Sequence, residues 1–68
     1  MGNEPAKKGT KKDAKRLKQL REALEMSQRD LAKEFYVSPG AVALWETGER
    51  PISGPVLKLM EIYEERLK

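Results

Sequence analysis

Two short helical segments, almost adjoining in the sequence, constrain this chain more than any other feature. The pattern predicts one helix over about residues 28–35 and another from Ser38 to Gly48, with only Tyr36 and Val37 between them. A serine can accept a hydrogen bond from the free amides of a first helical turn, and a glycine readily takes the left-handed conformation that follows a last turn. Helices this short, joined by so few residues, must cross steeply.

The apolar residues of these two segments fall where crossing helices would share a core. Counted from Leu31, the small Ala32 stands at position 1, and large apolar residues follow at positions 4, 6, 11 and 14. These larger residues are Phe35, Val37, Val42 and Trp45. Because a small side chain lets two helices approach closely, the arrangement predicts a helix-turn-helix motif. A mini-bundle without that motif would also need apolar residues at helical spacing, and it stays the alternative.

Two amphipathic segments flank this pair. The offsets of three and four residues between Leu17, Leu20 and Leu24 predict a first helix from Asp13. Ser53 offers an N-cap for a last helix with a wide apolar face. The stripe expected to cover the core comprises Val56, Met60, Tyr63 and Leu67. We therefore expect an all-α, compact domain of four to five helices.

Residues 1–12 have a different composition from the rest of the chain. They include two glycines and a proline, and beyond Met1 no apolar residue larger than alanine, so they cannot bury enough surface to offset the entropy of ordering. We expect a disordered basic arm over residues 1–12 and a folded domain over 13–68. Residues 1–16 carry six basic and two acidic residues, whereas the rest carries eight and nine. A basic arm on a nearly neutral body suggests a nucleic-acid partner, although a solubilising tail would have the same composition.

Composition disfavours several classes of function. The 68 residues contain no cysteine and no histidine, so the chain lacks thiolate and imidazole ligands for a metal, as well as the commonest nucleophile and general base. We expect no enzymatic activity, no metal and no cofactor. No apolar run approaches the length of a membrane span, and no apolar stretch follows the charged start as a secretion signal requires. We therefore expect a soluble, cytoplasmic protein without a membrane partner.

Over about residues 16–67, the chain resembles the phage-repressor type of helix-turn-helix domain, the Cro or XRE family. The matching strings are RLKQLREALEMSQRDLAKEF, then VSPGAVALWETGERP, then the closing apolar helix. The resemblance implies a repressor-like, sequence-specific transcription regulator that binds double-stranded DNA with its third helix in the major groove. Such a protein would be associated with the nucleoid when bound.

The resemblance also implies roles for individual residues. Gln28, which opens the second helix, would contact a DNA phosphate, and Arg50 in the loop after the third helix would approach the backbone. Arg29, at the start of the second helix, is a candidate phosphate contact in the same way as Arg50. Both residues are equally well explained as solvated charges. The family pairs Arg21 with Glu46. Independently of the family, a carboxylate near the end of a buried helix needs a cationic partner, because an unpaired buried charge is costly.

The third helix lacks the side chains that usually read bases. It would present near the bases Ser38, Pro39, Gly40, Ala41, Ala43 and Leu44. Direct readout mostly uses arginine, lysine, asparagine or glutamine, and none of these occupies the exposed start of the helix.

Three explanations of this departure stay open. In the first, small residues allow a close approach, Ala43 or Leu44 contacts thymine methyl groups, and DNA shape supplies part of the specificity. In the second, the arm reads a minor groove through its lysines, which are Lys7, Lys8, Lys11 and Lys12. In the third, the exposed surface of the helix binds a protein partner, as an interaction module or an antitoxin-type adaptor would.

Tyr36 stands where the family usually has a glycine in the turn. If the backbone has a positive φ there, a tyrosine costs on the order of 1 kcal/mol in strain. The alternative is that Tyr36 packs over the second helix and offsets this cost.

The last helix leaves a question about oligomeric state. Leu57, Ile62 and Leu67 give it more apolar surface than one core needs. Repressors of this type read two half-sites about one helical turn apart, so a homodimer through the last helix is a natural expectation. A truncated chain would expose the same surface.

Overall fold

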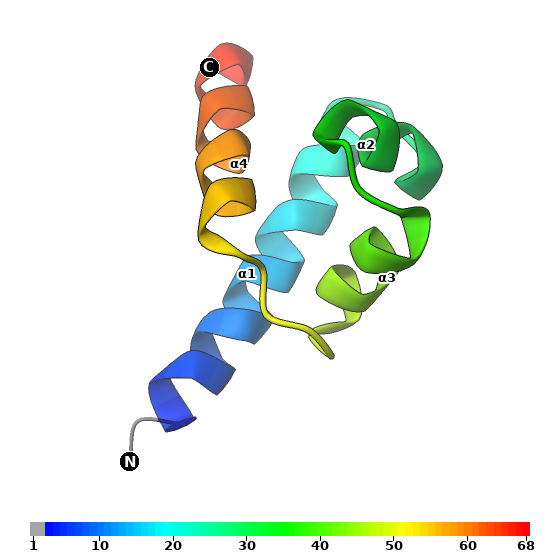
Figure 1. Cartoon of the computed structure of the whole chain (residues 1–68). Coiled ribbons are helices and arrows are strands. Elements are labelled where there is room, and N and C mark those ends of the chain that lie inside the picture. Colours follow the sequence, from blue (N-terminus) through cyan, green and yellow to red (C-terminus); the bar gives the residue numbers. More distant parts are fainter. Residues whose placement is uncertain (1–2) are drawn as a thin grey trace.

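The computed structural model describes the backbone of residues 3–68 and the side chains of residues 11–68. Within this range the chain forms four α-helices and no strand. They are α1 (Asn3–Ala23), α2 (Gln28–Phe35), α3 (Pro39–Thr47) and α4 (Gly54–Leu67). Figure 1 shows α1 in the middle of the molecule, with α4 on one side and the pair α2 and α3 on the other. The all-α prediction, with the lower of the two expected helix numbers, is confirmed.

The ends of the short helices are closed by the hydrogen bonds that the sequence favours. Ser27 Oγ accepts from the Asp30 amide at 3.0 Å, and the Ser27 amide donates to Asp30 Oδ2 at 3.2 Å, which completes a capping box at the start of α2. Ser38 Oγ accepts from the amide three residues later at 3.1 Å. Gly48 closes α3 with a φ of 83°. Ser53 is the N-cap residue of α4, as predicted, and has extended backbone, but its side chain makes no capping hydrogen bond.

The core is formed by residues of all four helices, and Ala32 is part of it. Only 1 % of the Ala32 surface is exposed, and its carbonyl accepts from the Val37 amide at 2.9 Å, which holds the turn against α2. The buried cluster comprises Leu17, Leu20, Leu31, Ala32, Phe35, Ala41, Val42, Trp45, Ile52, Val56 and Met60. The small residue therefore does allow the close contact between helices that the sequence predicted.

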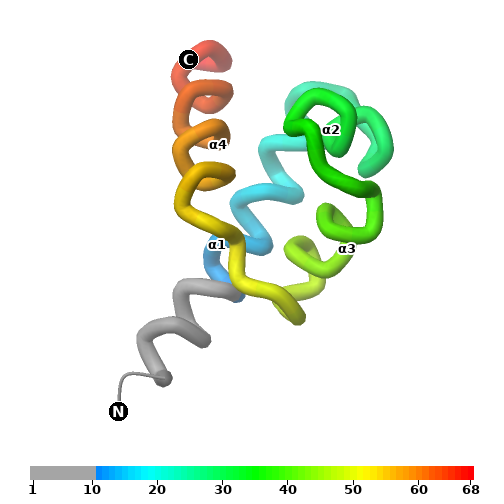
Figure 2. Tube along the Cα trace, in the orientation of Figure 1, coloured from blue at the N-terminus to red at the C-terminus, as the bar shows by residue number. Residues whose placement is uncertain are grey.

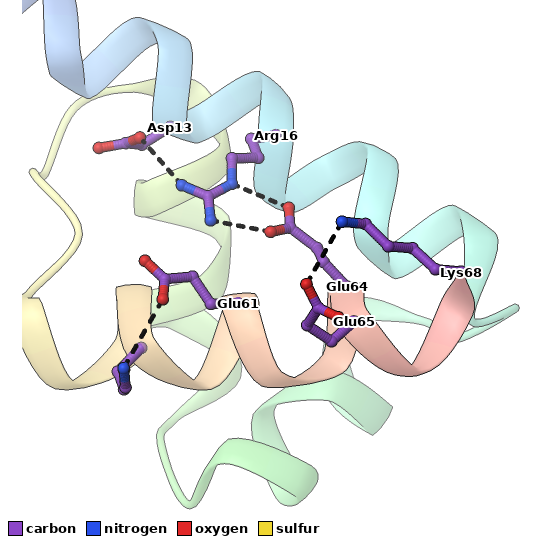
Figure 3. Close-up of polar contacts among 7 residues, drawn as sticks. Asp13, Arg16, Glu61, Glu64, Glu65 and Lys68 are labelled. Carbon is purple, nitrogen blue, oxygen red and sulfur yellow. Dashed lines mark hydrogen bonds and ion pairs between the residues drawn. The ribbon is translucent and has the colours of Figure 1, made fainter.

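The last helix is held to the rest of the molecule by apolar contacts in its first half and by polar contacts nearer its C-terminal end. Val56 and Met60 are buried in the core. Further along, Arg16 of α1 donates from Nε and Nη2 to the two carboxylate oxygens of Glu64, each at 2.8 Å, and its Nη1 lies 3.8 Å from Asp13 Oδ1 (Figure 3). The Tyr63 hydroxyl donates to Glu34 at 2.6 Å, which ties α4 to α2.

The end of α4 departs from the predicted stripe. Leu67 was expected to face the core, yet 47 % of its surface is exposed, so this prediction is wrong. The described contacts of α4 with α1 and α2 run as far as Tyr63 and Glu64, and the last turn continues beyond them. Ile62 is exposed, as expected for a residue off the stripe, whereas Leu57 is half-buried against the core.

The first helix begins earlier than predicted. Its bounds, Asn3–Ala23, place Lys11 and Lys12 on α1 with exposed side chains, whereas a helix from Asp13 was expected. No glycine or proline lies between Gly9 and the end of the helix, so nothing in that stretch stops it. The arm was predicted to be disordered, and the side chains of its residues 1–10 lie outside the described part of the chain. That prediction stays a prediction.

One negative finding concerns the membrane. Among the helices that the structure describes, none combines the length and the apolar character that crossing a bilayer requires.

Candidate nucleic-acid interface

The third helix has one buried face and one open face. Ala41, Val42 and Trp45 are buried in the core. The open face carries residues spaced by three, four and seven positions, which share one side of a helix; it comprises Gly40, Ala43, Leu44 and Thr47, and is called the aliphatic face below. Ser38 and Pro39 are exposed where α3 begins. The expectation that Ala41 would face the bases is wrong, because this residue is one of the three that anchor α3.

Hydrogen-bonding groups on the open side of α3 are already engaged within the protein. Thr47 Oγ1 donates to the Leu44 carbonyl at 3.0 Å and accepts from the Glu49 amide at 3.4 Å. Ser38 Oγ accepts from the Ala41 amide as the cap of the helix, which leaves its own hydroxyl hydrogen available. The aliphatic face therefore presents methyl and methylene groups to a partner.

Gly40 lies at the start of this face with open space above it. A β-carbon built on Gly40 would meet only Ser38 Oγ, at 3.9 Å, which is an ordinary van der Waals distance. The fold itself therefore does not require glycine here. A glycine is needed only if another molecule approaches the helix closely at this point.

The predicted pair of Arg21 and Glu46 forms the polar centre of the domain. Arg21 Nε donates to Glu46 Oε2 at 2.7 Å and Nη2 donates to Oε1 at 3.2 Å, while Nη1 donates to the Met26 carbonyl at 2.9 Å. The hydrogen bond to Glu46 raises the pKa of Arg21 above its usual value. The exposed fractions of the two side chains are 16 % for Arg21 and 5 % for Glu46, so the pair is largely shielded from water.

Gln28 joins this pair, which the sequence did not indicate. Its Nε2 donates to Glu46 Oε1 at 3.0 Å, across a separation of 18 residues. No local pattern reports a contact between positions so far apart, so only the folded arrangement of α2 against α3 reveals it. The side chain expected on a phosphate is thus oriented by a largely shielded carboxylate, and its carbonyl oxygen and second amide hydrogen are not used in that bond.

The predicted cationic contacts lie in two separate regions. Arg29, in the first turn of α2, and Arg50, beyond the end of α3, are both exposed. Among residues 11–68, no carboxylate lies within ion-pairing distance of either. Lys11 and Lys12 lie on α1, and Figure 2 shows that part of α1 well separated from the start of α3. The side chains of Lys7 and Lys8 lie outside the described residues.

The turn that sets the angle between α2 and α3 is strained. Tyr36 has φ 58° and ψ 45°, the left-handed conformation that a glycine would adopt at less cost. Its side chain is 95 % exposed, so the alternative in which Tyr36 packs over α2 is wrong. Glu25, in the connection between α1 and α2, also has a φ of 58°.

Comparison with known proteins agrees with this geometry. A family model described as helix-turn-helix matches residues 17–63, well over half of the 68 residues. The same comparisons gave no match among curated proteins or solved structures. The matched range runs from the first buried leucine of α1, through the tight turn and the open face of α3, to the tyrosine that ties α4 to α2. This chain therefore belongs to the Cro/XRE-type helix-turn-helix family of DNA-binding regulators.

Proposed function

We propose that the protein is a sequence-specific, repressor-like transcription regulator that places α3 in the major groove of double-stranded DNA. The observation that carries this proposal is the open face of α3, whose small residues permit an approach that larger ones would block. The major groove of B-form DNA is wide enough for an α-helix. In a helix-turn-helix motif the second helix, here α3, enters the groove. Acting on DNA in this way, the protein would work in the cytoplasm, at the nucleoid.

The contacts to the sugar-phosphate backbone are proposed for residues that flank this face. Ser38 has a free hydroxyl hydrogen at the start of α3, and Gln28 has an amide hydrogen and a carbonyl not used by Glu46. Arg29 and Arg50 add two exposed cations at the start of α2 and after α3. Such contacts fix the position of the protein on the duplex without reading its sequence. The lysines of α1, Lys11 and Lys12, with Lys7 and Lys8, would add attraction to flanking phosphates.

The test is a bulky substitution at Gly40, after selection of a bound sequence from random duplexes. Gly40→Phe is expected to weaken binding to the selected duplex about tenfold or more, because the ring would separate helix and groove. Folding should be retained, since the space above Gly40 is open and glycine is a poor helix former. Binding is measured by fluorescence anisotropy, and helicity and unfolding by circular dichroism.

Gly54 provides the matched control. It lies at the start of α4, where a β-carbon would meet no atom within 4 Å, and Figure 1 shows the start of α4 well away from the start of α3. Gly54→Phe should bind DNA as the wild type does. Equal affinity of the Gly40 and Gly54 variants would exclude α3 as the element in the groove. Failure to enrich any duplex, even at low salt, would exclude DNA binding altogether.

One observation favours a second candidate, a protein-interaction module or antitoxin-type adaptor. Residues 27–50, which contain α2 and α3, carry three basic and four acidic residues, so the motif itself has little attraction for a polyanion. If the random pool yields no bound duplex while the Gly40→Phe change abolishes binding of a protein partner, this second function is the correct one.

Dimerisation through α4 is the remaining part of the proposal. Ile62 and Leu67 expose 42 % and 47 % of their surfaces, and an isologous contact through them would place two α3 helices on one duplex. Sedimentation equilibrium should then give twice the chain mass, and Ile62→Asp should return the protein to a monomer. A monomeric wild type at concentrations that saturate DNA would exclude this arrangement.

A further inference from the structure

We propose that the aliphatic face of α3 reads methyl groups in the major groove, chiefly the C5 methyl of thymine, and does not read base edges by hydrogen bonds. This inference rests on the proposed function and concerns only what the site recognises. Its basis is the set of groups that the structure leaves on the open side of the helix.

The first step is the chemistry of the face itself. Gly40 has no side chain, Ala43 has one methyl, and Leu44 is half-buried with part of its aliphatic side chain still accessible. The hydroxyl of Thr47 both donates and accepts within the protein, so its γ-methyl is the group without a hydrogen-bonding role. None of these four residues can form the paired hydrogen bonds by which arginine recognises guanine or glutamine recognises adenine.

The second step is the chemistry of the groove. Guanine, adenine and cytosine present acceptors and donors there, and thymine presents an acceptor and a methyl group. An aliphatic surface pressed onto donors and acceptors leaves them without water or partners, which is unfavourable. The same surface pressed onto a methyl group buries apolar area on both molecules, which is favourable. The aliphatic face is therefore matched to positions where thymine occupies the strand that faces it.

The third step is that the proposed pose assigns the polar side chains near α3 to the DNA backbone, including the free hydroxyl hydrogen of Ser38 and the unused amide groups of Gln28. Gln28, the one amide side chain at the start of α2, is turned toward Glu46 by a 3.0 Å hydrogen bond. Arg29 and Arg50 lie at the start of α2 and beyond the end of α3, where phosphates are the nearer partners in the proposed pose. Lys11 and Lys12 lie on α1, which is not part of the helix-turn-helix pair. Discrimination between bases thus falls on methyl contacts.

The test replaces thymine by uracil in the selected duplex. Deoxyuridine keeps every hydrogen-bonding group of thymine and lacks only the methyl, so it isolates the proposed contact. Loss of each contacted methyl should weaken binding about fourfold, the factor expected for burying one such group. Uracil placed at thymines that lie outside the selected binding sequence should leave the affinity unchanged. Affinities are measured at constant salt by fluorescence anisotropy.

The protein side of the contact is tested with Leu44→Ala. If Leu44 contacts a thymine methyl, this variant should bind the thymine duplex more weakly and lose most of the discrimination between thymine and uracil at one position. Leu59→Ala is the control, because Leu59 is a half-buried leucine like Leu44 but lies on α4, where it packs against the core. It should keep the discrimination intact even where it lowers stability by a similar amount.

The outcomes separate the two proposals. Binding of the thymine duplex with no discrimination against uracil would overturn methyl readout and leave the proposed function standing. Discrimination that persists in Leu44→Ala, in Ala43→Gly and in Thr47→Ser would also overturn it, because the methyl would then be read by another part of the protein. Failure to bind any duplex would remove the proposed function and, with it, this inference.

Discussion

Arg21 and Arg16 each form a two-bonded pair with a glutamate, and the two pairs differ in their exposure to water. The side chains of Arg21 and Glu46 are 16 % and 5 % exposed, whereas those of Arg16 and Glu64 are 34 % and 33 % exposed. Removing one partner of a shielded pair leaves an uncompensated charge, while removing one partner of an exposed pair leaves a charge that water can solvate. The same chemical change should therefore have very different costs at the two sites.

Arg21→Met is expected to lower the free energy of unfolding by about 3 kcal/mol, because Glu46 would keep only the bond from Gln28. Arg16→Met should lower it by about 1 kcal/mol or less. Urea denaturation followed by circular dichroism measures both values. Similar losses in the two variants would show that the central pair is no more shielded than the outer one.

At Tyr36 the strain lies in the backbone and the side chain contributes little. Tyr36→Gly should raise the free energy of unfolding by about 1 kcal/mol, because the left-handed conformation no longer costs energy. Tyr36→Ala is the control, since it keeps the strain and removes a side chain that is 95 % exposed. The alanine variant should be as stable as the wild type in the same urea titration. If alanine destabilises the protein, Tyr36 makes a contact that its exposure does not show.

The attachment of α4 depends in part on titratable groups. Its bidentate bond from Arg16 lowers the pKa of Glu64 below the usual value of 4.5. A carboxylate whose pKa is lowered by folding stabilises the folded state above its unfolded pKa, and this contribution is lost as the pH falls through the lowered value. The docking of α4 should therefore weaken in acid.

The measurement is the free energy of unfolding as a function of pH for wild type and Glu64→Gln. The wild type should lose more stability than the variant as the pH falls below 4.5, with the two curves converging at the acid end. Glu65→Gln is the control on the same turn, because its pair with Lys68 is largely exposed. Parallel curves for wild type and Glu64→Gln would mean that Arg16 and Glu64 do not hold α4 in solution.

The elements also show how far the sequence could predict this fold and site. The starts of α2 and α3, the burial of Ala32 and Trp45 and the pair of Arg21 with Glu46 follow from local spacing, capping preferences and family resemblance. The bond from Gln28 to Glu46 and the free end of α4 depend on which helices meet, and periodicity within one helix does not encode this. Ala41 is different, because its spacing of four residues from Trp45 places it on the buried side of α3, and only its small size suggested the open one.

At the scale of the whole molecule, the excess of positive charge and the open face of α3 belong to different parts of the sequence. Residues 27–50 are close to neutral, whereas residues 1–16 hold six basic against two acidic residues. The described part of α1 carries four exposed lysines, and they are Lys11, Lys12, Lys15 and Lys18. If one duplex contacts both regions, α3 supplies the fit to the groove and α1 supplies much of the dependence on salt.

The salt dependence of binding tests this division directly. Each phosphate neutralised by a cation contributes about 0.9 to the slope of log affinity against log salt concentration. Changing Lys11 and Lys12 together to Gln should therefore reduce the slope by about 2 and leave discrimination between thymine and uracil unchanged. The control changes Lys58 and Lys68 to Gln, which removes the same charge from α4, where both lysines pair with glutamates. Because the two double variants have the same net charge, an equal reduction in both would mean that α1 attracts DNA only through the total charge of the protein. A reduction confined to the α1 variant would place its lysines on the phosphates.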